Sequence, residues 1–251
     1  MSTSLSSALQ WLDDVLQPAR YRDYCPNGLQ VEGRPTLRRL ATAVTANQGV
    51  LDRAIAWGAD ALLVHHGYFW KGEAEPVVGM KRRRLAALLG NDVSLLAYHL
   101  PLDAHPELGN NARLGQLLGI SAPEPLQPED PTSVGNVGEL EIAAGDLCRR
   151  LESLTGRQPL LIGERDRPLR RVAWCTGAAQ SYIDAAVKAG ADVFISGEIS
   201  EPTVHTAREE GIAYIAAGHH ATERYGVQAV GEALAQAFSL QHQFFDEDNP
   251  V

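Results

Sequence analysis

The placement of histidines and carboxylates is the feature of this sequence that most directly indicates chemistry. The chain has 8 histidines, and several of them are adjacent to each other or precede a carboxylate by one helical turn. The groups are His65-His66, His99 with Asp103, and His219-His220 with Glu223. Imidazole nitrogen and carboxylate oxygen together suit a divalent first-row metal. These residue types predict a metal centre, and two metals bridged by a carboxylate are a common device for hydrolysis.

Each group follows a short apolar run that is typical of a buried strand. The runs are 61–64, 93–98 and 212–215, and helical patterns occupy 4–16, 49–57, 82–89 and 221–238. Strands that alternate with helices in this way predict an α/β fold with a largely parallel sheet. Because ligands gather at the carboxyl ends of such strands, we expect the three groups to lie on one rim.

The local geometry of the groups leaves alternatives open. In a strand, His65 and His66 point to opposite faces, so they serve one site only if the strand has ended, or if they bind two metals from different sides. A helix that begins near His219 would place Glu223 on the same face. The prolines around Asp103 favour a loop there. A single histidine at a strand end is usually structural, but three such groups in one chain favour a metal.

The chain also repeats itself. Residues 38–60 align with residues 170–192 without a gap, and ten of the 23 positions are identical. We interpret this as an internal duplication of one strand–helix–strand unit. In this alignment Glu198 stands where the first copy has His66, so it is a candidate for the same cavity. A proline-rich connector at 121–133 divides the chain into 1–122, with His65, His66, His99 and Asp103, and 123–251, with His219 and Glu223.

Composition excludes several classes of protein. The chain has 251 residues, of which 45% are hydrophobic and 21% charged, as in a globular protein rather than a disordered or fibrous one. A formal net charge of -9 argues against a nucleic-acid partner, since such affinity comes largely from Lys and Arg. The basic runs Lys81–Arg84 and Arg165–Arg171 are short. There is no signal-peptide pattern, no membrane-spanning run and no paired-cysteine motif among the three cysteines, which favours a reducing cytoplasm.

The phosphate-binding and nucleophile motifs of common enzymes are absent from the sequence. There is no glycine-rich dinucleotide fingerprint, no P-loop and no nucleophile elbow. The segment Gly177–Gln180 follows a predicted strand and opens a helix, which makes it a candidate anion nest.

Several motifs taken together resemble those of the GTP cyclohydrolase I type 2 homolog family, also called the Nif-three-like family. They are, in order, Pro26–Gly33, His65-His66-Gly67, His99 to Asp103 with Gly109-Asn110-Asn111, Ser196-Gly197-Glu198 and Gly218–Glu223. The resemblance covers nearly the whole chain. It implies two similar, intertwined α/β/α halves with mixed or parallel sheets, and a toroidal homohexamer.

The resemblance also implies a dinuclear metal centre. Its ligands match His65, His66, Asp103, His219 and Glu223, with Glu223 as the bridge. His66 and Asp103 complete one metal, His65 and His219 the other, and His99 is a neighbour. One departure is Gly67-Tyr68, where many members have a proline after the two histidines. Nitrogen-rich ligation favours iron, zinc or manganese.

These observations lead to three functional hypotheses. The first is a metal-dependent hydrolase of a small nucleotide-like, phosphorylated or cyclic-amide substrate, with His99 or Glu198 as the group that moves protons. The second is a metal-binding scaffold or adaptor without catalysis, because structural sites are closed and catalytic ones keep an open position. The third is a nucleic-acid-binding protein, which requires oligomerisation to gather the two basic runs on one surface.

Overall fold

The chain folds into two compact units. The computed structural model describes residues 2–251. Unit 1 comprises the residues up to Leu102 together with Gly226–Asp248, and unit 2 comprises Asp103–Tyr225 and Asn249–Val251. Unit 1 therefore combines an N-terminal and a C-terminal segment, and unit 2 combines the middle of the chain with its last three residues.

These boundaries differ from the division into 1–122 and 123–251, and strand pairing is the reason. The proline-rich segment Ser121–Pro125 (β7) pairs antiparallel with Asn136–Ala143 (β8) and is thus part of the sheet of unit 2. The C-terminal strand Gln241–Phe244 (β13) pairs with Arg39–Thr45 (β4) and completes the sheet of unit 1. A connector rich in proline can still form an edge strand, because an edge strand does not need every N–H group.

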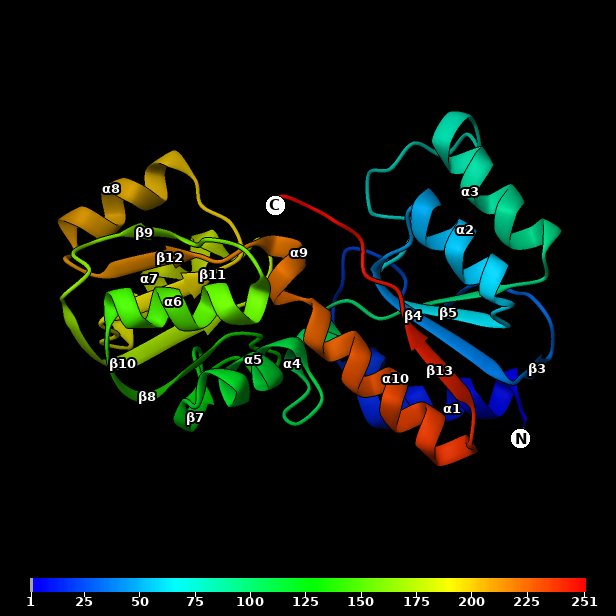
Figure 1. The fold of residues 1–251 in the computed structure, drawn as a ribbon, viewed down its shortest axis with the longest axis horizontal. Coiled ribbons are helices and arrows are strands. Elements are labelled where there is room, and N and C mark those ends of the chain that lie inside the picture. The colour runs from blue at the N-terminus through cyan, green and yellow to red at the C-terminus, as the bar shows by residue number, and fades with distance from the viewer. Residues whose placement is uncertain (1) are drawn as a thin grey trace. The chain divides into compact units, whose positions relative to one another are not determined.

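Unit 1 is an α/β/α sandwich with a five-stranded sheet in the order β13-β4-β5-β6-β2. The elements not yet defined are β2 (Gly28–Val31), β5 (Ala61–His66), β6 (Ser94–Ala97), α1 (Leu5–Leu16), α2 (Gln48–Trp57), α3 (Gly79–Gly90) and α10 (Arg224–Phe238). The strands β13, β4, β5 and β6 are parallel, and β2 is antiparallel to β6. α2 and α3 cover one face of the sheet, and α1 and α10 cover the other (Figure 1). Because both faces are covered, β5 and β6 are buried almost throughout.

The first helix shows how the sequence sets a local structure. Ser4 caps α1 by accepting a hydrogen bond from the Ser7 N–H at 3.0 Å. The buried residues are Leu5, Ala8, Leu12 and Leu16. Their spacing of three or four residues places them on one face of the helix. Gln17, in the left-handed conformation with φ 48°, ends the helix, and Pro18 follows it.

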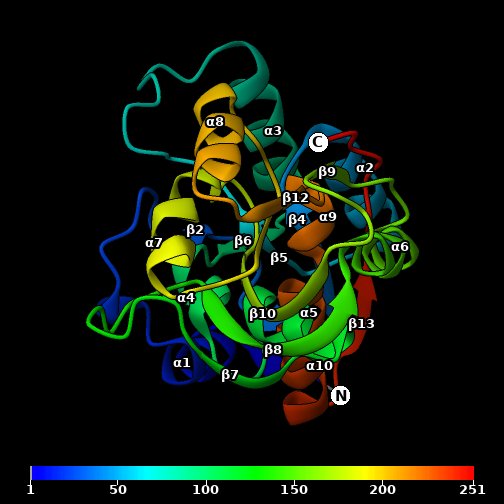
Figure 2. The ribbon, with the colours of Figure 1, turned by 90° about the vertical axis from the view of Figure 1, so that its left-hand side faces the viewer.

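Unit 2 is a second sandwich, with a six-stranded sheet in the order β7-β8-β10-β11-β12-β9. Its further elements are β9 (Leu160–Ile162), β10 (Pro168–Cys175), β11 (Val193–Ser196), β12 (Ala213–Ala216), α5 (Asn110–Leu118), α6 (Ala144–Thr155), α7 (Ile183–Lys188) and α8 (Glu201–Glu209). β10, β11 and β12 are parallel, and the other pairings are antiparallel. α5 and α6 lie on one face and α7 and α8 on the other (Figure 2). Trp174 is fully buried in the core beneath α5 and α6.

The duplication seen in the sequence is present in three dimensions. β4, α2 and β5 form the first copy, and β10, α7 and β11 form the second, with a 3-10 turn (η2, Gln180–Tyr182) in place of the first part of the helix. Asp60 accepts the backbone N–H groups of Arg38 and Arg39 at 2.7 and 2.9 Å. Asp192 accepts those of Arg170 and Arg171, both at 2.8 Å. The aspartate at the end of each aligned segment thus makes the same hydrogen bonds. The prediction of two similar α/β halves is confirmed.

Two local predictions are wrong. Asp103 lies in a short helix (α4, Leu100–Ala104) rather than in a loop. Pro101 is compatible with this helix because a first-turn residue has no intrahelical N–H bond to lose. The helix expected over 221–238 is interrupted at Glu223, which separates α9 (His219–Thr222) from α10.

The remaining short elements complete the description. They are β1 (Thr3–Ser4), β3 (Thr36–Leu37) and η1 (Pro18–Arg20). Within residues 2–251, no helix has both the length and the apolar character needed to cross a bilayer. The basic runs are partly neutralised: Lys81 pairs with Glu73 at 3.2 Å, and Arg170 pairs with Glu141 at 2.8 Å.

Candidate metal centre

His65 and His66 converge at the end of β5. Both residues are still within the strand, yet their ring centroids are 4.5 Å apart with the planes tilted by 42°. A nitrogen of each ring and a nitrogen of His99 all lie within 4.8 Å of one another. The adjacent histidines therefore lie close together at this strand end, although the strand has not ended before them.

A fixed partner orients each of these three imidazoles through Nδ1. The partners are the Tyr98 carbonyl oxygen for His65 at 3.1 Å, the Thr45 hydroxyl for His66 at 3.1 Å and an Asp23 carboxylate oxygen for His99 at 2.7 Å. Because a carbonyl oxygen only accepts, Nδ1 of His65 carries the proton and Nε2 presents its lone pair. Partners of this kind orient metal-binding histidines in proteins.

Asp23 is the carboxylate behind His99, and its side chain is only 3% exposed. Besides His99, it accepts the Tyr24 N–H at 2.7 Å, the Asn27 amide at 2.9 Å and the Leu100 N–H at 2.9 Å. Burial raises the pKa of Asp23, but the hydrogen bonds outweigh it and hold this pKa below its usual value. Asp23 is therefore an ionised acceptor whose two oxygens are both engaged.

Cys25 also lies near this pair. One atom each of Asp23, Cys25 and His99 fall within 4.8 Å of one another. Burial and the charge of Asp23 raise the pKa of the Cys25 thiol to about 12, so it stays protonated at neutral pH. Asp23 accepts three other hydrogen bonds besides its contact with His99, so this second group fixes the position of the His99 ring.

In unit 2, His219 lies between two carboxylates. Its Nδ1 is 2.6 Å from Glu198 Oε1, and its Nε2 is 3.2 Å from Glu223 Oε2. Burial lowers the pKa of His219, but hydrogen bonds to Glu223 and Glu198 and their charges outweigh it and raise the pKa to about 9. The side chain of Glu223 is 4% exposed. Glu198 thus orients His219, as Asp23 orients His99.

Asp103 is a second buried carboxylate of unit 2 and lies near Glu223. Its Oδ1 accepts the Asn110 amide at 2.9 Å and the Thr176 hydroxyl at 3.4 Å. A carboxylate oxygen of Asp103 lies within 4.8 Å of one of Glu223. Burial, with the charges of both carboxylates, raises the pKa of the fully buried Cys175 thiol. A protonated thiol beside Asp103 and Glu223 leaves oxygen and nitrogen as the donors of this group.

The loop after β10 makes room for these residues. A Cβ added to Gly177, whose φ is +71°, would lie 2.0 Å from Glu223 Oε1 and 3.4 Å from His219 Nε2. The N–H of Gly177 donates to the Thr222 hydroxyl at 3.1 Å, and that of Ala179 donates to Ser196 at 3.2 Å. The N–H groups of Gly177 and Ala179 thus already have acceptors within the protein, and the anion nest at Gly177–Gln180 stays a prediction.

The donor chemistry of both groups fits a divalent transition metal. Unit 1 offers three imidazoles, and unit 2 offers two carboxylates and one imidazole, each held by a hydrogen-bonding partner. Sequence reasoning named all of these donors but missed the residues that orient several of them. Asn110 stood within a quoted motif, whereas Asp23 and Thr45 gave no signal because they contact the histidines only through the fold.

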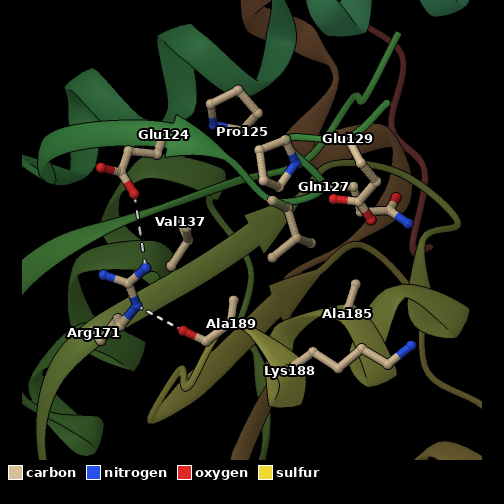
Figure 3. A pocket seen from close by; sticks show the side chains of 11 residues that line it. Glu124, Pro125, Gln127, Glu129, Val137, Arg171, Ala185, Lys188 and Ala189 are labelled. Atoms are coloured by element: carbon tan, nitrogen blue, oxygen red, sulfur yellow. Dashed lines mark hydrogen bonds and ion pairs between the residues drawn. The ribbon is translucent and has the colours of Figure 1, made fainter. Parts of the chain in front are cut away.

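The cavity shown in Figure 3 is separate from the predicted ligands. It has a volume of about 290 Å³ and lies in unit 2, where Arg171 is 3.8 Å from Glu124 and donates to the Ala189 carbonyl at 2.8 Å. None of its lining residues is a predicted ligand. The arginine belongs to the duplicated framework, because its backbone N–H donates to Asp192.

Comparison with known proteins decides the family. The model of the Duf34/NIF3 (NGG1p interacting factor 3) family matches residues 3–250. The chain belongs to the Duf34/NIF3 family. A relative named "GTP cyclohydrolase 1 type 2 homolog", from Pseudomonas aeruginosa, is 55% identical to this chain over 253 residues, and the alignment covers 100% of both chains. The resemblance inferred from the motifs is therefore confirmed.

Solved structures agree with the Duf34/NIF3 assignment. A structure described as protein ybgI of unknown function has a TM-score of 0.93 and 47% identity, covering 99% of this chain and 100% of that one. The protein TTHA1606 from Thermus thermophilus has a TM-score of 0.90 and 34% identity, with coverage of 99% and 100%. The fold of two related α/β halves is thus shared along the full length of these family members.

Proposed function

We propose that this Duf34/NIF3 protein is a dinuclear metal-dependent hydrolase of a small nucleotide-like, phosphorylated or cyclic-amide substrate. The observation that carries the proposal is the orientation of the imidazoles through Nδ1 in both units. A purely structural histidine needs no such uniform arrangement, whereas a metal-binding imidazole does. When bound, a pair of divalent metals supplies Lewis acidity and lowers the pKa of bound water toward about 7.

The proposed ligands are His65 and His66 of unit 1 and Asp103, His219 and Glu223 of unit 2. Glu223 is the proposed bridge, because its two oxygens can each serve one metal. We propose iron, zinc or manganese as the metals, because these accept mixed nitrogen and oxygen ligation.

The residues around the ligands fix their orientation. Glu198 holds Nδ1 of His219, and Asn110 holds one oxygen of Asp103. Both former candidates for proton transfer, His99 and Glu198, belong to imidazole–carboxylate pairs. We therefore assign Glu198 to positioning rather than to proton transfer.

Metal analysis of Glu223→Ala tests the bridge. We expect the purified wild type to bind two metals per chain and the variant to lose at least one of them, because removal of a bridge affects both ions. Glu209→Ala, at an exposed position near the end of α8, is the matched control and should keep both. Retention of two metals by Glu223→Ala would refute the bridging assignment.

A substrate screen separates the hydrolase from the scaffold. We expect the metal-loaded protein to hydrolyse a phosphoester, nucleotide or cyclic amide, and Glu223→Ala to lose that turnover by at least 100-fold. A metal-loaded structure should show an open coordination position. A centre saturated by protein ligands, with no turnover in the screen, would support the non-catalytic scaffold instead.

We further propose that the protein is a homo-oligomer, with the toroidal hexamer as the expected assembly. In support, Val77, Val78 and Met80 at the start of α3 are 50%, 66% and 56% exposed and form a contiguous apolar stretch. Such stretches are typical of protein contacts. Light scattering should give the mass of six chains, and a monomer in solution would contradict the proposal.

A further inference from the structure

We infer that a cavity at the amino end of the sheet of unit 1 binds the phosphate group of a small molecule. The cavity has a volume of about 410 Å³, which is in the range of small-molecule sites. Its lining residues are Arg34, Arg38, Arg39, Gly58, Asp60 and Gln241. Three guanidinium groups and one carboxylate leave this lining with an excess of positive charge, although the whole chain has a formal net charge of -9. Arginine suits a phosphate group because its planar fork can donate two parallel hydrogen bonds to it.

This arginine-lined cavity lies at the opposite end of the sheet from the proposed metal ligands of unit 1. Arg39 opens β4 and Asp60 precedes β5, whereas His65 and His66 are the last residues of β5. At a rise of about 3.3 Å per residue, the six residues of β5 separate its two ends by roughly 16 Å. The cavity is therefore a separate site, and its occupation does not depend on the proposed hydrolase activity.

Arg34 is held in place by acceptors of the protein. Its guanidinium group donates to the carbonyl oxygen of Asn91 at 2.8 Å and to that of Asp92 at 3.2 Å. It also pairs with Asp60 at 3.0 Å, and Asp60 accepts two backbone N–H groups besides. The Arg34 side chain is nevertheless 44% exposed. A ligand can thus reach a guanidinium group whose position is already fixed, which lowers the entropy that binding costs.

The other two guanidinium groups have no carboxylate partner. Arg39 donates to Gln241 Oε1 at 3.0 Å and to the Trp57 carbonyl oxygen at 3.0 Å, and both of these acceptors are neutral. Arg38 is exposed, and its guanidinium group makes no hydrogen bond or ion pair with any residue in 2–251. Two positive charges beside the cavity are therefore not balanced by the described part of the chain.

Unit 2 shows what balances the aligned arginines of the duplication. Arg170 donates to Glu141 Oε1 at 2.8 and 3.1 Å, and Arg171 is 3.8 Å from Glu124. These carboxylates come from β7 and β8, whereas in unit 1 the neighbouring strand β13 supplies the neutral Gln241. The same pair of arginines thus has anionic partners within unit 2 and lacks them in unit 1. A phosphate group from outside the chain would take the place of those carboxylates.

Calorimetric titration of the full-length, metal-loaded protein tests the inference, with orthophosphate and ribose 5-phosphate as the probes. We expect Arg38→Gln to weaken the binding of both probes at least 10-fold. Its Tm should stay unchanged, because the Arg38 side chain has no partner within residues 2–251. Arg170→Gln, at the aligned position of unit 2, is the matched control and should bind as the wild type does, because Glu141 already occupies that arginine. Tighter binding of ribose 5-phosphate than of orthophosphate would identify a phosphate ester, and equal binding would identify free phosphate.

A second variant supplies the carboxylate that unit 1 lacks. In Gln241→Glu, the new carboxylate can pair with Arg39, so we expect the fold to persist and the affinity for both probes to fall at least 10-fold. Gln243→Glu adds the same charge at an exposed position of β13 that does not line the cavity, and it should keep the affinity of the wild type.

The possible outcomes separate this site from the metal centre and from a contact between chains. A wild type that binds neither probe, or equal weakening by Arg38→Gln and Arg170→Gln, would overturn the inference. Binding that chelation of the metals abolishes and that Arg38→Gln leaves unchanged belongs to the metal centre, which also overturns it. A change in oligomeric mass on Arg38→Gln, with unchanged affinity for both probes, would assign the cavity to a contact between copies of the chain instead.

Discussion

The two units share a strand–helix–strand framework but differ in the donors that they place at its strand ends. At equivalent positions of the duplication, unit 1 has His66 and unit 2 has Glu198. The framework aspartates Asp60 and Asp192 have kept the same hydrogen bonds. The aspartates that hold the framework together are therefore the same in both units. The residues at the strand ends differ, because unit 1 has more imidazoles there and unit 2 has more carboxylates.

Both units also contain a histidine–carboxylate pair, although the two carboxylates are not aligned in the duplication. In each, a histidine that follows the third parallel strand has its Nδ1 held by a carboxylate, at 2.7 Å for His99 and 2.6 Å for His219. The carboxylate comes from Asp23, ahead of β2, in unit 1, and from Glu198, after β11, in unit 2. Each unit therefore orients a histidine with a carboxylate, but the two carboxylates come from segments that are not equivalent in the duplication.

Alanine at the glycine nearest the ligands should affect metal binding by the two units differently, and this is the largest difference between the units that we expect. In Gly177→Ala, the new Cβ lies 2.0 Å from Glu223 Oε1, so the carboxylate must move. We expect metal affinity to fall at least 10-fold. In Gly67→Ala, the new Cβ lies 2.2 Å from Gln30 Oε1 and 2.6 Å from Ala97 Cβ. Here we expect mainly a stability loss of about 1–3 kcal/mol from overpacking.

Metal titration and urea unfolding of both glycine variants check this contrast. Equal loss of metal by Gly67→Ala and Gly177→Ala would contradict it. Gly90→Ala serves as a control for metal binding, because no atom lies within 4 Å of the Cβ that it would add and its φ is not positive.

Removing the framework aspartate should cost more stability in unit 1 than in unit 2. Asp60 accepts two backbone N–H groups and also pairs with Arg34 at 3.0 Å, and its side chain is 10% exposed. Asp192 accepts two backbone N–H groups and is more exposed. Because unsatisfied buried donors cost about 1–3 kcal/mol each, we expect losses of about 3 kcal/mol for Asp60→Ala and about 2 kcal/mol for Asp192→Ala.

Urea unfolding of the two aspartate variants measures these losses. Asp60→Asn, which keeps an acceptor oxygen, should recover part of the stability. A larger loss of stability for Asp192→Ala than for Asp60→Ala would contradict this prediction, because Asp60 makes more contacts than Asp192.

The smallest effect concerns the strand that pairs with the first strand of each copy, which is β13 beside β4 in unit 1 and β8 beside β10 in unit 2. β13 of unit 1 carries His242, whose Nε2 is 2.8 Å from the Thr42 hydroxyl, whereas β8 of unit 2 has no histidine. Burial lowers the pKa of His242, and the charge of Glu232 offsets only part of this. The folded state therefore disfavours the protonated ring. Its contribution to stability is present above the unfolded pKa of about 6.5 and is lost as pH falls through the folded pKa.

Unfolding of wild type and His242→Gln between pH 7.5 and pH 5 checks this sign. We expect the stability of the wild type to fall slightly more on acidification than that of the variant. An equal fall, or a larger one in the variant, would show that His242 does not contribute to the acid sensitivity of unit 1.

Much of the fold could be predicted because its signals are local. The apolar spacing and Ser4 cap of α1, and the aligned copies at 38–60 and 170–192, depend on residues close in sequence. Local signals failed where pairing at a distance decided the outcome. The proline-rich segment 121–125 became an edge strand because β8 is available to pair with it. The helix after His219 is broken at Glu223, although the apolar pattern continues through this position.

The sequence by itself determined the family and the duplicated framework, because residue types and their spacing carry that information, and it supplied the residues that we propose as metal donors. Only the tertiary structure showed that Nδ1 of His99 is held by Asp23 and one oxygen of Asp103 by Asn110. Asp23 and His99 are 76 residues apart. A contact over that distance arises from strand order and packing, and no local pattern encodes it. The fold thus adds the orientation that turns a set of donors into a candidate metal centre.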